Sequence, residues 1–356
     1  MNKNEWIIYK ENFKQEAFKN KKSKEYIYFN LNYAENLAKK DLPIIYNPDH
    51  LGKLIGIKSS YFFKVTNKTT LFYRKFSIKK RNGKKRIIHE PLPNLKIIQK
   101  WILKNILYKL EVSKFAKAYT PNVSIKDNVR FHRNQKYVLK LDIKNFFGSL
   151  SEKQVYKIFR NLGYFNDVSV LLTKLCTLNG HLPQGASTSA YLSNLILLDF
   201  DKTVSSFCKK RNIRYTRYAD DLSFSGSFNH KALLNFINYQ LKLLSLELNH
   251  SKTRLLKQQQ SQIITGIVVN QKIQVSRNYR KKIRLEIYYI NKFGLYEHLK
   301  HIGAKVEAKA YLRSLYGKIC YCLFINPNDL KMEFYKDFIE NIIQEFQLKN
   351  NESLHF

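Results

Sequence analysis

Two adjacent aspartates, Asp220 and Asp221, lie between two short stretches that alternate like β-strands, Arg214–Arg217 and Leu222–Ser225. The pattern predicts a β-hairpin with both carboxylates at its tip. Two carboxylates this close repel each other, and burying them raises at least one pKa. A divalent cation removes this cost, and oxygen is the ligand that Mg²⁺ prefers. The feature therefore indicates a metal-binding turn, with a solvated turn as the alternative because Asp is common in turns.

A third carboxylate, Asp142, ends another predicted strand. In Tyr137–Ile143 the apolar Leu139 and Leu141 share one face, and Asp142 falls on the other. Taken alone, it could simply cap the next segment. Together with the hairpin tip it suits nucleotidyl transfer, which uses two metal ions about 3.5–4 Å apart to hold the attacking and leaving oxygens.

The charge of the chain narrows the class of partner. The 356 residues include 63 Lys and Arg against 27 Asp and Glu, a formal net charge of +36. Such a surplus favours a polyanion, either nucleic acid or an anionic membrane. We find no apolar run long enough to cross a bilayer and no signal-peptide core, so nucleic acid is favoured and no membrane role is expected. The four cysteines form no metal-binding pattern, and we expect reduced thiols in the cytoplasm.

Hydrophobic periodicity predicts a mixed α+β chain. A hairpin is expected around Asn82-Gly83, a dipeptide favoured in tight β-turns. Short strands are also expected at 262–275. The predicted helices cover 1–50, 95–110, 152–175, 188–210, 230–246 and the chain from 278 onward.

The motifs occur in an order that resembles reverse transcriptases, over roughly residues 70 to 330. Asp142-Ile143-x-x-Phe146-Phe147 is followed by Leu182–Ser189 and then by Tyr218-Ala219-Asp220-Asp221. Further pieces fall in the family's order: the basic stretch Lys79–Arg86, the helix with Gln99 and Trp101, Leu248–Thr253 and Ile264–Asn270.

The resemblance implies an α+β right-hand polymerase fold with fingers, a ferredoxin-like palm and a helical thumb. We expect a helical N-terminal extension at 1–60, fingers at 61–135, a palm at 136–276 that includes interleaved fingers helices, and a thumb at 277–356.

The resemblance also implies roles at the catalytic centre. Asp142 and Asp220 are expected to bind two Mg²⁺ ions directly, with the Ile143 carbonyl helping and Mn²⁺ as an alternative ion. Asp221 would bind or orient the metal on the primer side.

Other positions are implied to hold the incoming deoxynucleotide. Arg86 and one of Lys79 or Lys80 would grip the triphosphate, and Gln184 and Gly185 would touch the nucleotide and template. Phe147 would exclude a 2′-hydroxyl, with an ordinary core Phe as the alternative. Lys252 is a candidate acid for pyrophosphate departure or an ordinary surface Lys.

Two smaller motifs resemble those of retron reverse transcriptases. They are Asn128-Val129-Arg130-Phe131-His132, with Val129 where relatives have Ala, and Ile264-Thr265-Gly266, with Ile264 where relatives have Val. Ala190 also departs from the Pro of many relatives. A local hydrogen-bonding pair on one helix face is the alternative for Asn128 and His132. The positions expected to contact RNA or primer are Asn128, His132, Tyr218, Thr265, Gly266, Arg277, Arg280, Lys281 and Arg284, and a solvated basic face is the alternative for the last four.

The retron resemblance implies a cognate structured non-coding RNA that is both template and primer, through a 2′-hydroxyl. It further implies a branched RNA–DNA product (msDNA), a separate effector protein and a role in anti-phage defence. Two alternatives stay open: another bacterial reverse transcriptase (group II intron-like, diversity-generating or a stand-alone defence polymerase) and a catalytically idle RNA-binding scaffold. The sequence does not indicate the oligomeric state.

Overall fold

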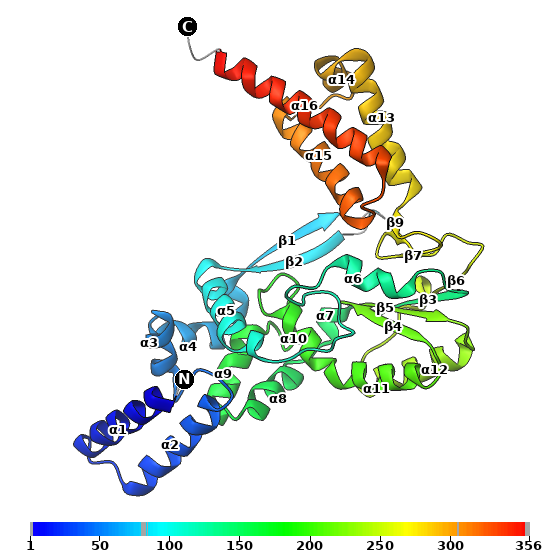
Figure 1. Ribbon diagram of the computed structural model, residues 1–356. Coiled ribbons are helices and arrows are strands. Elements are labelled where there is room, and N and C mark those ends of the chain that lie inside the picture. The colour runs from blue at the N-terminus through cyan, green and yellow to red at the C-terminus, as the bar shows by residue number, and fades with distance from the viewer. Residues whose placement is uncertain (1–2, 80–82, 84, 305, 353–356) are drawn as a thin grey trace.

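A computed structural model describes residues 3–79, 83, 85–304 and 306–352 of the chain, which form an α+β molecule with a separate helical bundle at its C-terminal end (Figure 1). The N-terminal helices form a hairpin that projects from the body. Their stacked aromatic side chains fix them to it: Tyr33 lies 3.6 Å from Phe165, ring centroid to ring centroid. These helices are α1 (Lys3–Lys19), α2 (Lys24–Ala38) and α3 (Pro48–Ile55).

The central four-stranded sheet has the strand order β4-β5-β3-β6 and is antiparallel throughout. Its apolar face, with Leu139, Leu141 and Phe224, is buried in the main core. Both the strand ending at Asp142 and the hairpin at 214–226 are therefore confirmed. The strands are β3 (Tyr137–Asp142), β4 (Arg214–Tyr218), β5 (Asp221–Gly226) and β6 (Arg254–Lys257).

Helices share the main hydrophobic core with the apolar face of this sheet. The amphipathic pattern of 152–175 is divided at Gly163, whose φ of +106° ends the first helix in the left-handed conformation. The helices of this layer are α8 (Glu152–Leu162), α9 (Asn166–Cys176), α10 (Ser189–Ile196), α11 (Leu198–Lys209) and α12 (His230–Lys242), with the short α7 (Phe146–Ser149) after β3.

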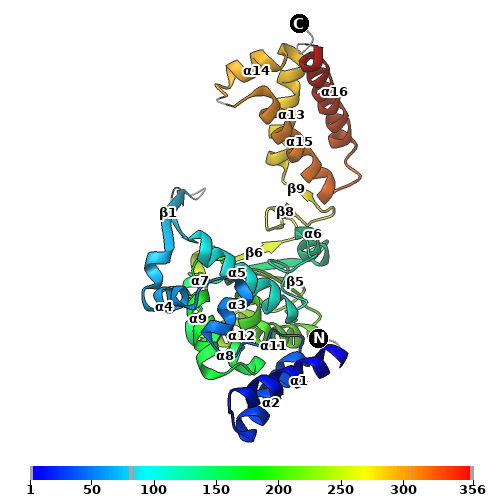
Figure 2. The same cartoon turned by 90° about the vertical axis from the view of Figure 1, so that its left-hand side faces the viewer.

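A long two-stranded hairpin rises from the body toward the C-terminal bundle (Figures 1 and 2). Its strands pair from Tyr73↔Pro91 to Lys79↔Lys85, which confirms the predicted hairpin, although the turn residues 80–82 and 84 lie outside the described part. The elements are α4 (Ser59–Asn67), η1 (Thr69–Phe72), β1 (Tyr73–Lys79), β2 (Lys85–Pro91), α5 (Pro93–Asn105) and η2 (Leu107–Lys109).

The C-terminal bundle has its own hydrophobic core, and a small three-stranded sheet belongs to that core as well. Ile264, Ile267 and Val275 of this sheet pack with Leu315 and Ile319 of the bundle. Figure 2 shows the bundle standing clear of the body above this sheet. The elements are β7 (Ile263–Ile264), β8 (Ile267–Val268), β9 (Gln274–Val275), α13 (Arg277–Phe293), α14 (Leu295–His301), α15 (Ala308–Ile325) and α16 (Leu330–Glu352).

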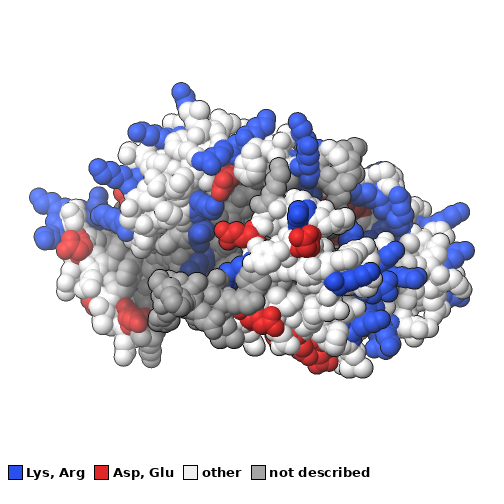
Figure 3. Space-filling model, turned by 90° about the horizontal axis from the view of Figure 1, so that it is seen from above, with Lys and Arg blue, Asp and Glu red and all other residues white. Residues whose placement is uncertain are grey.

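The surface is strongly basic. Seen from above, Lys and Arg side chains far outnumber acidic ones over the visible face (Figure 3). None of the described helices has the length and apolar character required to cross a bilayer.

Candidate active site

The sheet register brings the predicted carboxylates together. Asp142 at the end of β3 lies directly opposite Asp221 at the start of β5, and Asp221 in turn lies opposite Tyr218 of β4. Residues that face each other in antiparallel strands project on the same side, with Cβ atoms about 4.5–5.5 Å apart. Asp142, Asp221 and Tyr218 therefore form a row across the polar face of the sheet.

Asp220 is held at the tip of the hairpin by backbone geometry. Ala219 has a φ of +58°, the left-handed conformation that a two-residue hairpin turn requires. The Ile143 N–H donates to the Asp220 carbonyl at 3.0 Å, so the residue after Asp142 is bonded directly to the tip. This hydrogen bond joins the end of β3 to the β4–β5 turn, and the three carboxylates lie at that junction.

Asp142 is buried and carries two side-chain partners. Lys252 Nζ donates to Asp142 Oδ2 at 2.6 Å, and Asn249 Nδ2 donates to Oδ1 at 3.0 Å. The Asn249 N–H also donates to the Asp142 carbonyl at 2.7 Å. Lys252 lies in η4 (His250–Lys252), so the predicted Leu248–Thr253 stretch does reach the site.

The electrostatics of the site match the repulsion expected from the sequence. Burial, and then the charges of Asp220 and Asp142, raise the pKa of Asp221 to about 6. Burial and the charge of Asp142 also raise the pKa of Asp220. Desolvation acts to lower the pKa of Lys252, but its hydrogen bond to Asp142 and the three carboxylate charges raise it overall.

The donor set fits a divalent cation, because crowded, partly buried carboxylate oxygens with raised pKa values are stabilised by added positive charge. Within the described residues, no group of three His, Cys, Asp or Glu side chains is arranged to hold a metal ion as it stands. At Asp142 both carboxylate oxygens accept hydrogen bonds, Oδ1 from Asn249 and Oδ2 from Lys252.

A fully buried ion pair between Arg217 and Asp201 lies next to the β4–β5 turn. Arg217 Nη2 lies 2.6 Å from Asp201 Oδ2, and both side chains have no exposed surface. The same guanidinium donates to Asn194 Oδ1 at 2.9 Å and to the Ala219 carbonyl at 3.3 Å. It therefore ties α10, α11 and β4 to the turn that presents Asp220.

The predicted nucleotide-binding loop lies against the long hairpin. The His89 N–H of β2 donates to the Gln184 carbonyl at 2.8 Å. Gly185 has a φ of +126°, and a Cβ there would lie 2.7 Å from the His89 carbonyl oxygen, so only glycine fits. Buried Gln99 accepts from the Ser187 N–H at 3.1 Å, which holds the same loop from α5.

The predicted triphosphate-binding cations lie on the same hairpin. Arg86 is exposed on β2, and its charge is one of the influences that act to lower the pKa of Asp220. Lys79 is exposed at the end of β1, whereas Lys80 lies outside the described residues.

Phe147 is half-buried rather than a core residue. Its ring centroid lies 5.2 Å from that of Phe146 and 6.3 Å from that of Tyr119. Burial, and then the negative charge of Asp220, raise the pKa of Tyr119.

The Asn128 and His132 side chains have no exposed surface, so in this structure neither can touch RNA directly. His132 bonds Ser225 Oγ at 2.7 Å and Thr216 Oγ1 at 2.8 Å, and Asn128 Nδ2 donates to Thr265 Oγ1 at 3.4 Å. The two do not bond each other, so the alternative of a local helical pair is wrong. They connect α6 (Ile125–Val129) and η3 (Arg130–His132) to the central sheet and to the β7–β8 turn.

The remaining predicted contacts lie near the bundle. Thr265 and Gly266 form the β7–β8 turn with φ values of +46° and +85°. Arg277, Lys281 and Arg284 are exposed on α13. Arg280 differs, because it forms an ion pair with Asp329 at 2.8 Å and so ties α13 to the segment before α16.

Sequence reasoning missed several residues of the site: Arg217, Asp201, Asn194, Asn249 as a partner of Asp142, and Tyr119. One signal was available, because strand alternation places Arg217 on the same face as Leu139 and Leu141, where a lone cation needs a buried partner. Nothing in the local pattern of Tyr119 or Asn194 indicates a role.

Comparison with known proteins agrees with this geometry. The family described as "Reverse transcriptase (RNA-dependent DNA polymerase)" matches residues 78–269. The Ec86 retron reverse transcriptase of Escherichia coli is 32% identical over 274 residues, which cover 76% of this chain and 84% of that protein. The Mx65 retron reverse transcriptase of Myxococcus xanthus is 31% identical over 299 residues, covering 78% of this chain and 67% of the relative.

Among solved structures, telomerase from Candida albicans in complex with a fragment of telomeric RNA has a TM-score of 0.42 and 15% identity, over 76% of this chain and 59% of that chain. The family match and the identity to the retron enzymes show that the chain belongs to the reverse transcriptases and, among them, to those of retrons: it is an RNA-directed DNA polymerase with a right-hand polymerase fold.

Proposed function

We propose that Asp142, Asp220 and Asp221 are the catalytic carboxylates of this retron reverse transcriptase. The observation that carries the proposal is the register of Asp142 opposite Asp221, with Ile143 bonded to Asp220. Bound divalent ions would activate the primer hydroxyl and stabilise charge on the leaving pyrophosphate. The chain's own part is to hold the carboxylates through β3, β5 and the Arg217 network.

The other site residues follow from the same geometry. Arg86 and one of Lys79 or Lys80 would hold the triphosphate, since guanidinium and ammonium groups stabilise charge on phosphate oxygens. Lys252, whose ammonium lies 2.6 Å from Asp142 Oδ2, would give a proton to departing pyrophosphate. Gln184 and Gly185 would border the nucleotide from the loop fixed by His89.

We further propose the retron product and role. The enzyme would copy part of a structured non-coding RNA encoded beside it, starting from the 2′-hydroxyl of a guanosine in that RNA, and leave a branched RNA–DNA hybrid. Anti-phage defence with a separate effector protein, in the cytoplasm, completes the proposal. Its support is the membership in the retron family and the exposed basic surface.

The subdomain bounds also remain our proposal: extension 1–60, fingers 61–135, palm 136–276 and thumb 277–356. The second hydrophobic core concerns the proposed boundary between palm and thumb at residues 276 and 277. Ile264, Ile267 and Val275, which precede this boundary, pack with the helices that follow it. The strands at 263–275 are thus joined to the thumb by packing, although they precede it in the chain.

The catalytic assignment is tested by the double substitution Asp220→Asn and Asp221→Asn. We expect primer extension on an RNA template to fall by more than about a hundredfold, since the metal clamp loses two anionic ligands. RNA binding, measured by fluorescence anisotropy, should persist. Substantial DNA synthesis by the double variant would overturn the assignment.

The proposed product is tested separately. Nucleic acid extracted from cells that express the chain with its flanking DNA should contain a short branched RNA–DNA species. Treatment with a debranching enzyme should release linear DNA. An active polymerase that yields only linear DNA in such cells would overturn the priming proposal while leaving the catalytic assignment intact.

A further inference from the structure

A cavity of about 670 Å³ lies beside the edge strand β4, outside the catalytic site. Its walls come from α11, from β4 and from the loop and η3 segment that precede β3. Phe115 and Phe131 contribute aromatic rings, and Lys114, Lys117, Lys209 and Arg214 contribute four cations. The volume falls within the about 300–1,000 Å³ typical of small-ligand sites. None of the three catalytic carboxylates lines it.

The cavity has an excess of positive charge. Among the described residues that line it there is no Asp or Glu. Burial, with the charges of Arg130 and Lys114 and against that of Asp127, lowers the pKa of Lys117. The positive groups thus crowd together without a matching anion in the wall, which favours an anionic ligand.

Cations and aromatic rings are interleaved around this cavity. Lys117 Nζ lies 5.4 Å from the centre of the Phe131 ring, and Lys114 Nζ lies 5.5 Å from that of Phe115. Stacking surfaces beside ammonium groups match a nucleotide, whose base presents a flat π-face and whose phosphates carry negative charge.

The buried retron-like motif fixes one wall of the cavity. Arg214 Nη1 donates to the Phe131 carbonyl at 2.7 Å. The next residue, His132, is bonded to Thr216, which also lines the cavity. Phe131 itself is 42% exposed. The fully buried Asn128 and His132 therefore anchor a segment whose exposed ring faces the cavity.

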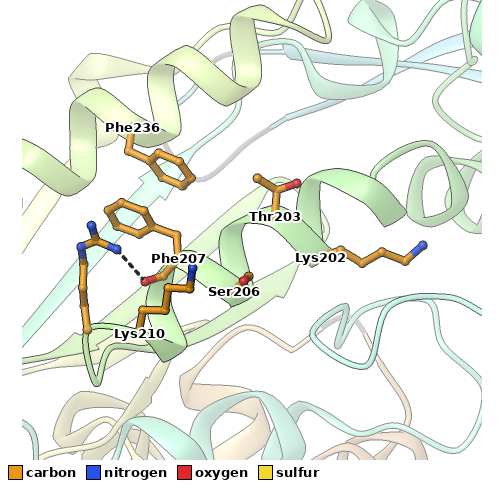
Figure 4. A pocket seen from close by; sticks show the side chains of 7 residues that line it. Lys202, Thr203, Ser206, Phe207, Lys210 and Phe236 are labelled. Carbon is orange, nitrogen blue, oxygen red and sulfur yellow. Dashed lines mark hydrogen bonds between the residues drawn. The ribbon is translucent and has the colours of Figure 1, made fainter.

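A second hollow of about 560 Å³ shares Ser206 with the cavity. Figure 4 shows the side chains that line this second hollow. There Arg211 lies 3.8 Å from the ring centre of Phe207, which is stacked on Phe236 at 3.9 Å. Lys202 and Lys210 border the same hollow. Lys202 lies in α11 and forms an ion pair with Asp199, whereas Lys210 and Arg211 follow the end of that helix. Positive side chains thus continue past the cavity, as a polynucleotide backbone would require.

We propose that the cavity holds one unpaired nucleotide of the RNA that this enzyme binds, with the base stacked on Phe131 or Phe115 and its phosphates at Lys114, Lys209 and Arg214. The cavity and the active site lie toward opposite ends of β4. Arg214, at the start of the strand, lines the cavity, and Asp220, just after its end, is at most about 20 Å away. It would anchor the RNA at a fixed point while other nucleotides are copied. The inference rests on the proposed function, because it supplies the contact point for the RNA partner.

A free nucleotide has the same chemistry as a nucleotide within RNA, so the test must separate the two. We would irradiate the full-length protein with a short single-stranded RNA that carries one 4-thiouridine, and map the cross-linked peptides by mass spectrometry. Unlabelled RNA of the same sequence and uridine monophosphate serve as competitors. Primer extension by the unchanged protein, measured in parallel, tests the proposed function independently.

We expect cross-links in the peptides that contain Phe131 or Phe115. Phe131→Ala should reduce them about tenfold, in line with the loss of one stacked base. Lys114→Ala with Lys209→Ala should also reduce them, because this variant removes two of the cations that would hold the phosphates. These side chains are exposed, so folding should survive. The matched control is Phe63→Ala with Lys64→Ala, an exposed pair on α4, which should leave the yield unchanged.

Three outcomes would overturn the inference. The cross-links could map to peptides outside the cavity, or the α4 control variant could lose as much cross-link yield as the cavity variants. Uridine monophosphate could also compete as effectively as the unlabelled RNA. The last outcome would assign the cavity to free nucleotides. An unchanged protein that fails to extend any primer would count against the proposed function, whereas active polymerase without cavity cross-links counts against the cavity alone.

Discussion

Phe147 is partly buried against the main core, and this incomplete burial favours a gate over a core role. The rings of Phe146 and Tyr119 are its aromatic neighbours. Phe146 itself is a core residue, because only 5% of its surface is exposed. Phe147 lies in α7, five residues after Asp142, and an aromatic ring there can occupy the space that a 2′-hydroxyl of the incoming nucleotide would need. Exclusion of one hydroxyl by an apolar wall has a moderate effect, about ten- to two-hundredfold.

Phe147→Val should therefore lower the preference for deoxynucleotides about tenfold or more. The measurement is single-nucleotide primer extension, comparing kcat/KM for a deoxynucleotide and the matching ribonucleotide. Phe146→Val is the matched control, since it removes a neighbouring ring inside the core and should reduce stability without changing the preference. Equal discrimination by Phe147→Val and the unchanged protein would remove the gate assignment.

His132 gives a pH dependence of stability. Burial, and then the charge of Arg214, lower its pKa to about 3, well below its ordinary value of 6.5. The folded protein therefore keeps His132 neutral, while the unfolded chain binds a proton below about pH 6.5. Stability is fully present above that pH and is lost progressively as the pH falls toward 3, by about 2 kcal/mol at pH 5.

Urea unfolding between pH 5 and 8 measures this effect. In the His132→Gln variant the group cannot titrate, so the difference in unfolding free energy between the two proteins should shrink as the pH falls. Other titrating groups act equally on both proteins and cancel in the difference. A difference that stays constant across the range would show that His132 is not held neutral by the fold.

At the scale of elements, the catalytic hairpin depends on a charge buried beneath it. Arg217 and Asp201 have no exposure, and the guanidinium also reaches Asn194 and the Ala219 carbonyl. Removing one partner of such a pair leaves an uncompensated buried charge, which costs about 3–5 kcal/mol, whereas replacing both by apolar groups costs less.

Arg217→Met should accordingly destabilise the protein by about 3–5 kcal/mol, and adding Asp201→Leu should recover part of that loss. Urea unfolding of the two single variants and the double variant provides the cycle. Additive losses would show that the two side chains contribute independently of each other. Primer extension by the double variant, relative to its folded fraction, would report how far the Ala219 contact positions Asp220.

The elements themselves were largely predictable from sequence, and the polar networks were not. Alternation in Leu139-Lys140-Leu141-Asp142 predicts both the strand and the face of its carboxylate, because strand periodicity is local. Arg217 with Asp201, by contrast, is a contact between different elements, and its geometry depends on how α11 crosses the sheet. The same applies to Asn128, whose partner Thr265 lies 137 residues away.

At the scale of the whole molecule, two hydrophobic cores divide the protein. The larger extends from Tyr33 to Leu248, and the other joins the 263–275 strands to the C-terminal helices. Val129 and Val138, one of them in the retron-like motif, pack into the second core. The buried side chains of the motif therefore connect the C-terminal bundle to the central sheet, in addition to fixing the position of the exposed Phe131.

The exposed cations of α13 should carry part of the RNA affinity. Binding to phosphates releases counterions, and the slope of log affinity against log salt changes by about 0.9 for each duplex phosphate contact. Replacing Arg277, Lys281 and Arg284 by Gln should thus reduce the slope by about two to three, measured by fluorescence anisotropy with an RNA–DNA duplex. Arg280 is left out of the variant because it forms an ion pair with Asp329.

The control variant replaces three exposed lysines of the N-terminal hairpin, Lys19, Lys22 and Lys24, and so removes the same amount of positive charge. It should leave the slope almost unchanged, since those helices lie far from the C-terminal bundle (Figure 1). Equal reductions in both variants would mean that net charge, and not the face of α13, governs binding to the product duplex.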